Sequence, residues 1–146
     1  MNPENTARLL NAYPLLYRNL RDQTFECNDG WFDLVDQVSA DIESTAQLES
    51  TPKTAEAWPS VGIVKIKFAT LRVQFNGHVS DAIREFANEA GSQSEKICHL
   101  CGATALPMPK INRWEEPLCV NCTEASQRTQ ANPRPHPVWM QEQNSR

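Results

Sequence analysis

The sequence predicts an α+β fold in which two amphipathic helices pack on a β-hairpin, followed by a four-cysteine zinc ribbon or knuckle and an extended proline-rich tail. Two observations predict it. Segments with apolar residues at helical spacing flank a segment in which apolar and basic residues alternate. Four cysteines in two C-x2-C pairs follow. We therefore expect an α+β domain over residues 1–94, a zinc ribbon over 95–125 and a tail over 126–146.

Two helices are predicted before the hairpin. The first covers residues 3–12, with Pro3 in its first turn, where proline is tolerated. The second follows the turn signal Asn28-Asp29-Gly30, in which Asp29 is a candidate helix cap. Its apolar residues recur at i, i+4, i+7 and i+11, namely Trp31, Val35, Val38 and Ile42. Acidic residues fall on the opposite side, so we expect this helix to show an acidic face to solvent.

Residues 61–75 have the two-residue period of half-buried strands. Val64 and Ile66 alternate with Lys65 and Lys67, and the alternation resumes after Phe68-Ala69-Thr70. We therefore expect an antiparallel hairpin that turns at those three residues.

A further amphipathic helix is predicted after the hairpin. We expect it to start at Ser80 or Asp81 and to stop at Gly91, because glycine commonly ends a helix. Its predicted buried face consists of Val79, Ile83, Phe86, Ala87 and Ala90.

The paired cysteines are Cys98, Cys101, Cys119 and Cys122. Their spacing is that of a zinc site, and two thiolates from each pair complete a tetrahedron. Four thiolates leave no open position for water or substrate, so we expect one structural Zn²⁺. An iron site and a redox pair of C-x2-C motifs are the alternatives. His99 lies between two ligands and is expected at the surface.

Composition restricts the location. The net charge is −4, and residues 1–50 carry nine acidic against three basic residues. The sequence shows no secretory signal and no run of about 20 apolar residues, so we expect a cytoplasmic protein without membrane contact. A reducing cytoplasm weighs against disulfides between the paired cysteines. Cys27 lies apart from them and is expected to be a small buried hydrophobe rather than a reactive thiol.

Two features are candidates for binding a partner protein. The acidic helix face has no compensating lysine, although an ordinary solvated helix face is the alternative. In the tail, two apolar residues follow a polyproline stretch suited to docking, although a disordered terminus is the alternative. The candidate residues are Asp29, Asp33, Asp36, Glu43, Trp139 and Met140.

A basic set in the second half of the chain is the candidate for nucleic-acid contact. It consists of Lys65, Lys67, Arg72, Lys110 and Arg113, with Trp114 available to stack on a base. The alternative is that strand lysines only keep an exposed face soluble.

Catalysis has no recognisable residue set. The phosphate-binding loop, the G-x-S-x-G elbow, the H-E-x-x-H motif and the zinc-deaminase signature are all missing from the sequence. We therefore expect neither an enzyme nor a small-molecule substrate.

Four blocks carry a resemblance to a known family, at residues 13–17 (YPLLY), 25–32 (FECNDGWF), 65–73 (KIKFATLRV) and 98–102 (CHLCG), followed by the second C-x2-C pair. Together they resemble a family of short, largely uncharacterised bacteriophage and prophage proteins with a C-terminal zinc ribbon. That family usually has a glycine at the position of Ala69. The resemblance implies a phage origin and carries no established activity.

The expected function is therefore non-enzymatic. We expect a phage-type zinc-binding protein that binds and inhibits a host protein or protein–nucleic acid complex in the bacterial cytoplasm, for example as an anti-CRISPR-like, anti-defence protein. A nucleic-acid-binding regulator that uses the zinc ribbon and the basic strand is the first alternative. A structural module of a larger assembly is the second.

Overall fold

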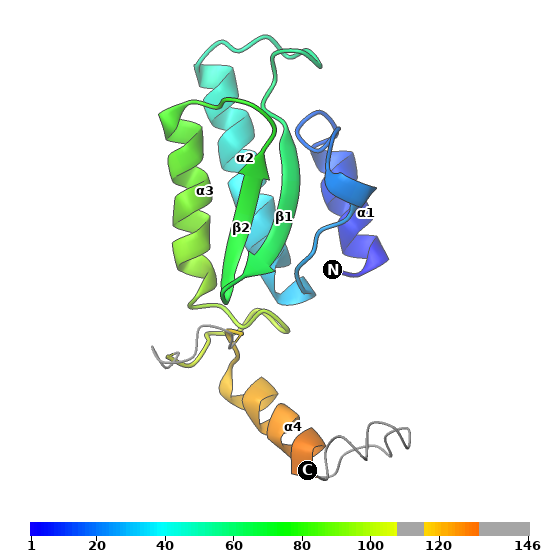
Figure 1. The fold of residues 1–146 in the computed structure, drawn as a ribbon, viewed down its shortest axis with the longest axis vertical. Helices are drawn as coiled ribbons and strands as arrows, with labels where there is room; N and C mark the ends of the chain where they lie inside the picture. The colour runs from blue at the N-terminus through cyan, green and yellow to red at the C-terminus, as the bar shows by residue number, and fades with distance from the viewer. Residues whose placement is uncertain (108–115, 132–146) are drawn as a thin grey trace, which may run out of the picture.

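The structure is a computed structural model that describes residues 1–107 and 116–131. Its helices and strands are α1 (Pro3–Ala12), α2 (Phe32–Leu48), β1 (Val61–Lys67), β2 (Thr70–Phe75), α3 (Asp81–Ser94) and α4 (Val120–Ala131), and a short 3-10 helix, η2 (Asp29–Trp31), leads into α2 (Figure 1). The α+β class and the antiparallel hairpin are thereby confirmed. The expected proline-rich tail lies outside the described residues, apart from its first six residues.

The hairpin turns tightly between the two strands. Lys67 pairs with Thr70, which leaves Phe68 and Ala69 as a two-residue turn. Both have positive φ, 52° and 63°, as a type I′ turn requires. Such a turn strongly favours Asn-Gly, so this chain adopts the left-handed conformation twice without a glycine.

Neither long edge of the hairpin is bare. On the β1 side, the backbone of Glu26 pairs in parallel with the strand: its N–H donates to the Val64 carbonyl at 2.8 Å, and its carbonyl accepts from the Ile66 N–H at 3.1 Å. On the β2 side lies α3 (Figure 1), whose Ser94 hydroxyl accepts from the Leu71 N–H at 2.9 Å. Covering edges in this way prevents uncontrolled strand pairing.

Gly91 does not end α3, contrary to the sequence-based prediction. The helix continues to Ser94, and a Cβ built on Gly91 would lie 3.1 Å from the Leu71 carbonyl oxygen. The glycine is thus explained by the close approach of β2. At the other end the expected cap is confirmed, because the Ser80 hydroxyl accepts from the Ile83 N–H at 3.3 Å.

One core joins α1, α2, α3 and the hairpin. Its fully buried residues include Leu9 of α1, Val35 of α2 and Val64 of β1. Phe86 is 38% exposed, so its assignment to the buried face of α3 was wrong. Cys27 is in the core, and burial raises the pKa of its thiol to about 11, which fits the expected buried hydrophobe.

The cysteine segment is a knuckle followed by a helix rather than two knuckles. Ile97 and Thr104 form an antiparallel bridge that closes the first pair into a tight turn. The second pair lies at the start of α4, which begins directly after Cys119. The expected zinc ribbon is therefore wrong in its second half, and α4 continues to Ala131 in a segment predicted to be extended. The sequence could not distinguish the two structures for the second pair, because a C-x2-C spacing suits a β-knuckle and a helical turn alike.

None of the helices within 1–107 and 116–131 is long and apolar enough to span a bilayer.

Candidate metal centre

The four paired cysteines come together although seventeen residues separate the pairs. Their Sγ atoms all lie within 4.8 Å of one another, and those of Cys101 and Cys119 are 3.5 Å apart. A tetrahedral ion with Zn–S bonds of about 2.3 Å requires sulfur–sulfur separations of about 3.8 Å. All four are free thiols, so the geometry fits a metal and not a pair of disulfides.

Backbone hydrogen bonds shape the turn that carries the first cysteine pair and favour the thiolate form of Cys98. The Cys98 N–H donates to the Ala103 carbonyl at 2.7 Å, and the Gly102 N–H donates to the Cys98 carbonyl at 2.9 Å. Gly102 has φ 84°, which its missing side chain permits. Burial alone would raise the pKa of the Cys98 thiol, but N–H groups of Cys119, Cys101 and Leu100 outweigh it and lower the pKa to about 6.

The second pair uses a helix start in the same way. The Cys122 N–H, in the first turn of α4, donates to the Cys119 sulfur at 3.4 Å. The neighbouring thiols of Cys119 and Cys98 raise the pKa of the Cys122 thiol to about 12. Four sulfurs this close cannot all ionise without a cation between them, and a soft divalent metal supplies that charge. An ion held by all four sulfurs would be coordinatively full.

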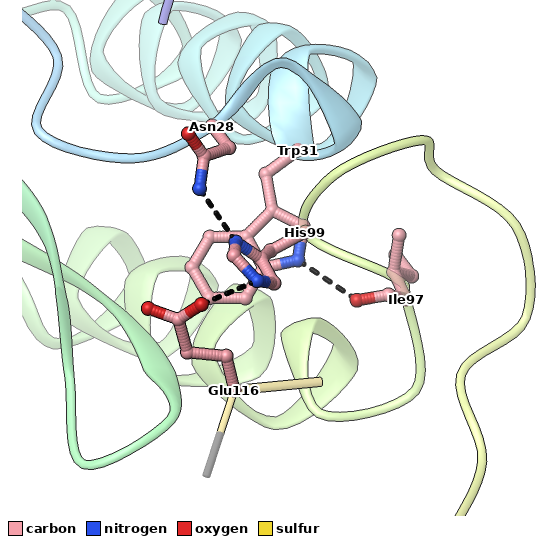
Figure 2. Close-up of polar contacts among 5 residues, drawn as sticks. All are labelled: Asn28, Trp31, Ile97, His99 and Glu116. Carbon is pink, nitrogen blue, oxygen red and sulfur yellow. Dashed lines mark hydrogen bonds and ion pairs between the residues drawn. The ribbon is translucent and has the colours of Figure 1, made fainter. Parts of the chain in front are cut away.

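His99 anchors this knuckle in the body of the protein. It was expected at the surface, but it is only 2% exposed. Its Nδ1 lies 2.7 Å from the Asn28 amide nitrogen, its Nε2 lies 2.7 Å from a Glu116 carboxylate oxygen, and its ring meets the Trp31 ring edge-on (Figure 2). The Asn28 nitrogen can only donate, so Nδ1 accepts and the proton resides on Nε2, facing Glu116. Burial lowers the pKa of His99 against the opposing effect of Glu116, which favours this neutral form.

Backbone contacts make the same junction tight. The Gly30 N–H donates to the His99 carbonyl at 3.0 Å, and a Cβ on Gly30 would lie 2.2 Å from the Cys98 carbonyl oxygen. The Trp31 indole N–H donates to the Ile97 carbonyl at 3.0 Å (Figure 2). The knuckle and the residues that lead into α2 are therefore one packed unit.

Sequence reasoning missed this junction. Asn28 and Gly30 were interpreted as a turn, and neither Glu116 nor His99 was assigned a partner. The only available signal was the block at 25–32 itself, in which a polar turn directly precedes a large aromatic residue. Nothing in that pattern says that the other side of the contact comes from residues 97–99 and from Glu116.

The predicted acidic face is divided by its own hydrogen bonds. Asp29 does not cap α2; its carboxylate accepts from the Asn2 N–H at 2.9 Å and from the Asn5 amide at 3.1 Å. Asp36 is half-buried and accepts from the Tyr13 hydroxyl at 2.7 Å. Glu43 is half-buried as well, and Asp33 alone of these four acids is exposed without a described hydrogen bond. Of the predicted acidic face, Asp29 and Asp33 are exposed, whereas Asp36 and Glu43 are only partly accessible to solvent.

The basic residues of the hairpin share one face. Lys65 pairs directly with Arg72, and Lys67 follows two residues later on the same side of β1. Lys67 and Arg72 are exposed, and Lys65 is partly buried. The remaining predicted contacts, at Lys110, Arg113, Trp114, Trp139 and Met140, lie outside the described residues.

No protein-family model, no curated protein and no solved structure matches the chain.

Proposed function

We propose that this chain is a non-enzymatic zinc-binding protein that acts by stoichiometric binding to another protein or protein–nucleic acid complex. The observation that carries this proposal is the closed four-thiol centre, whose knuckle is packed into the fold by His99 and Gly30. A metal held by four sulfurs stabilises structure and offers no site for catalysis. The resemblance to phage proteins sharpens the proposal to an anti-defence inhibitor that works in the cytoplasm of a bacterial host.

A partner surface is best supported on exposed acidic residues. Asp33 on α2 and both Glu85 and Glu89 on α3 are exposed, and Phe86 lies between the two glutamates with 38% of its surface accessible. An exposed aromatic ring flanked by carboxylates is suited to a partner with a basic, partly apolar surface.

Charge reversal tests this surface. A tagged, zinc-loaded chain is used to capture partners from bacterial lysate, and the stoichiometry of each complex is then measured with purified components. We expect Asp33→Lys combined with Glu85→Lys and Glu89→Lys to abolish capture. The matched control is Glu56→Lys, on an exposed loop, which should capture normally. The proposal fails if no stoichiometric partner is recovered or if both variants behave alike.

The identity of the metal is tested separately. Metal analysis of the purified chain should give about one equivalent of zinc, lost in Cys101→Ser. A different metal, or no metal with all thiols free, would contradict the zinc assignment.

A nucleic-acid regulator is the second candidate, and the pairing of Lys65 with Arg72 favours it. With Lys67, these side chains form a basic strip on one face of the hairpin. An electrophoretic shift assay at two salt concentrations tests this candidate. Binding should weaken with salt and be lost in Lys65→Glu, Lys67→Glu double variants. If neither proteins nor nucleic acids bind, the chain is best explained as a structural module of a larger assembly.

A further inference from the structure

The face of the hairpin that is turned away from the core carries the basic strip of Lys65, Lys67 and Arg72. Val64 and Leu71 are fully buried, and successive strand residues point to opposite faces, so the strip lies on the other face. Figure 1 shows α2 behind the two strands, on the side of the buried residues. Lys65 lies directly opposite Arg72, and Lys67 follows Lys65 on the same side of β1.

The charges of the basic strip are not compensated by neighbouring carboxylates. Like charges directly opposite each other on paired strands destabilise a sheet. Within 1–107 and 116–131, no carboxylate forms an ion pair with any of the three residues. The backbone of Glu26 pairs beside Lys65, but its carboxylate is held by Arg21 at 2.6 Å. A bound anion would relieve the repulsion between Lys65 and Arg72.

An aromatic ring adjoins one end of the basic strip. Phe68 follows Lys67 in the hairpin turn and is 45% exposed, and the Lys67 ammonium lies 5.5 Å from the centre of its ring. Phe68 has φ 52°, which is rare for a bulky residue, and such strained conformations are concentrated at binding sites. The turn therefore places an accessible aromatic ring beside a row of positive charges.

This combination suits a single-stranded nucleic acid better than a duplex. A base can stack on a protein ring only when it is not stacked on its neighbours, and a single strand offers such bases. A duplex would have to unstack a base step at a considerable cost. A duplex also carries about twice the charge per unit length, so a chain of net charge −4 repels it more strongly.

We propose that the basic strip and Phe68 bind a single-stranded nucleic acid. Phosphates pair with Lys65, Lys67 and Arg72, and one base stacks on the Phe68 ring. Binding tolerates many sequences, because every base has a face that can stack. This inference rests on the second candidate function, nucleic-acid binding, and adds to it the strandedness of the ligand and the residue that contacts a base.

The test is a fluorescence-anisotropy titration of the zinc-loaded full chain with labelled strands of about twelve nucleotides. Oligothymidine and oligouridine should both bind, and each should bind more tightly than a duplex of the same length. Three phosphate contacts predict that the affinity for a single strand falls about twentyfold between 50 and 200 mM salt. Lys67→Gln should weaken binding and make it less dependent on salt.

Variants of Phe68 test the stacking contact. Phe68→Leu keeps an apolar side chain but removes the ring, so it should weaken single-strand binding about tenfold and leave the salt dependence unchanged. Phe68→Trp keeps a ring and should bind at least as tightly as the parent chain. The matched control is Phe86→Leu, because Phe86 is 38% exposed but lies between Glu85 and Glu89 on α3, and it should not change binding.

The outcomes separate this inference from the function on which it rests. If no nucleic acid binds, the second candidate function and the inference fail together. If the duplex binds as tightly as the single strands, or if Phe68→Leu binds as well as the parent, nucleic-acid binding stands and the inference is overturned. The comparison of single strand with duplex uses the parent chain, so it does not depend on the folding of any variant.

Discussion

His99 shows how a residue that lies between two candidate metal ligands can have a structural role of its own. Its ring is buried between Asn28 and Glu116 and contacts Trp31, while its own backbone belongs to the knuckle. The side chain therefore holds the knuckle against the residues at the start of α2. A neutral imidazole with one donor and one acceptor is the group that suits both of its partners.

Replacing His99 with alanine should destabilise the zinc-loaded protein by about 2–3 kcal/mol, because a buried side chain that hydrogen-bonds Asn28 and contacts Glu116 is lost and Trp31 loses an aromatic contact. Chemical denaturation followed by tryptophan fluorescence measures this change. His78→Ala is the matched control, since that histidine is exposed in a loop, and it should change stability little. Equal effects of the two substitutions would contradict the anchoring role of His99.

Asp29 is a second residue whose role follows from its hydrogen bonds. Its pKa is lowered chiefly by the Asn2 N–H and further by Asn5, so the ionised form is favoured in the folded state. A carboxyl group with a lowered folded-state pKa stabilises the fold above its unfolded pKa and loses that contribution as the pH falls through the folded value.

Asp29→Asn should therefore be less stable than the parent at neutral pH, and the difference should vanish at acidic pH. The window is set by the direction of the pKa shift: the difference is constant above about pH 5, shrinks as the pH falls below the ordinary pKa of 3.8, and disappears once the pH is below the lower folded-state pKa. Denaturation midpoints of both proteins across this range measure it. A difference that persists unchanged at low pH would show that the charge of Asp29 is not involved.

At the scale of elements, the periodicity of apolar residues predicted the helices and strands that bury one face. The apolar spacing of α2 and the alternation in β1 and β2 each follow from one face being buried, so these elements were predictable. Gly91 and His99 were not, because their roles depend on Leu71 and Glu116, which are distant in sequence. The candidate metal site was predictable only in part. The cysteine spacing identified the four candidate ligands, but it did not predict that the second pair lies at the start of a helix.

The hairpin turn is an element that the sequence leaves strained. Alanine at φ 63° costs about 1–2 kcal/mol relative to a right-handed conformation, a cost that glycine avoids. Ala69→Gly should therefore stabilise the protein by about 0.5–1 kcal/mol, after allowing for the greater freedom of glycine in the unfolded chain. Thermal unfolding measures the gain. Gly77→Ala, also at positive φ but in open space, is the reverse control and should destabilise. A loss of stability in Ala69→Gly would show that the buried methyl group outweighs the backbone strain.

At the scale of the whole molecule, we expect a metal bound by the four cysteines to stabilise more than the segment that carries them. The knuckle is joined to the residues before α2 through Gly30, Trp31 and His99, and those residues continue into the main core. Metal binding to four thiolates contributes about 10 kcal/mol or more in small structural zinc sites, and we expect zinc binding here to stabilise the junction as well.

Removal of the metal with a chelator should therefore loosen residues 28–31 as well as the knuckle. Hydrogen exchange of the Gly30 amide and of the Trp31 indole, which donate to the His99 and Ile97 carbonyls, should accelerate together with exchange of the Cys98 amide. The hairpin amides that face the partner strand, such as Lys65 and Arg72, are the internal control and should stay protected longer, since the ladder does not include the paired cysteines. If exchange accelerates only in the knuckle and in α4 while Gly30 and Trp31 remain protected, the junction is held by the core alone. The same measurement on Cys101→Ser should reproduce the chelated pattern, because one missing thiolate opens the closed centre.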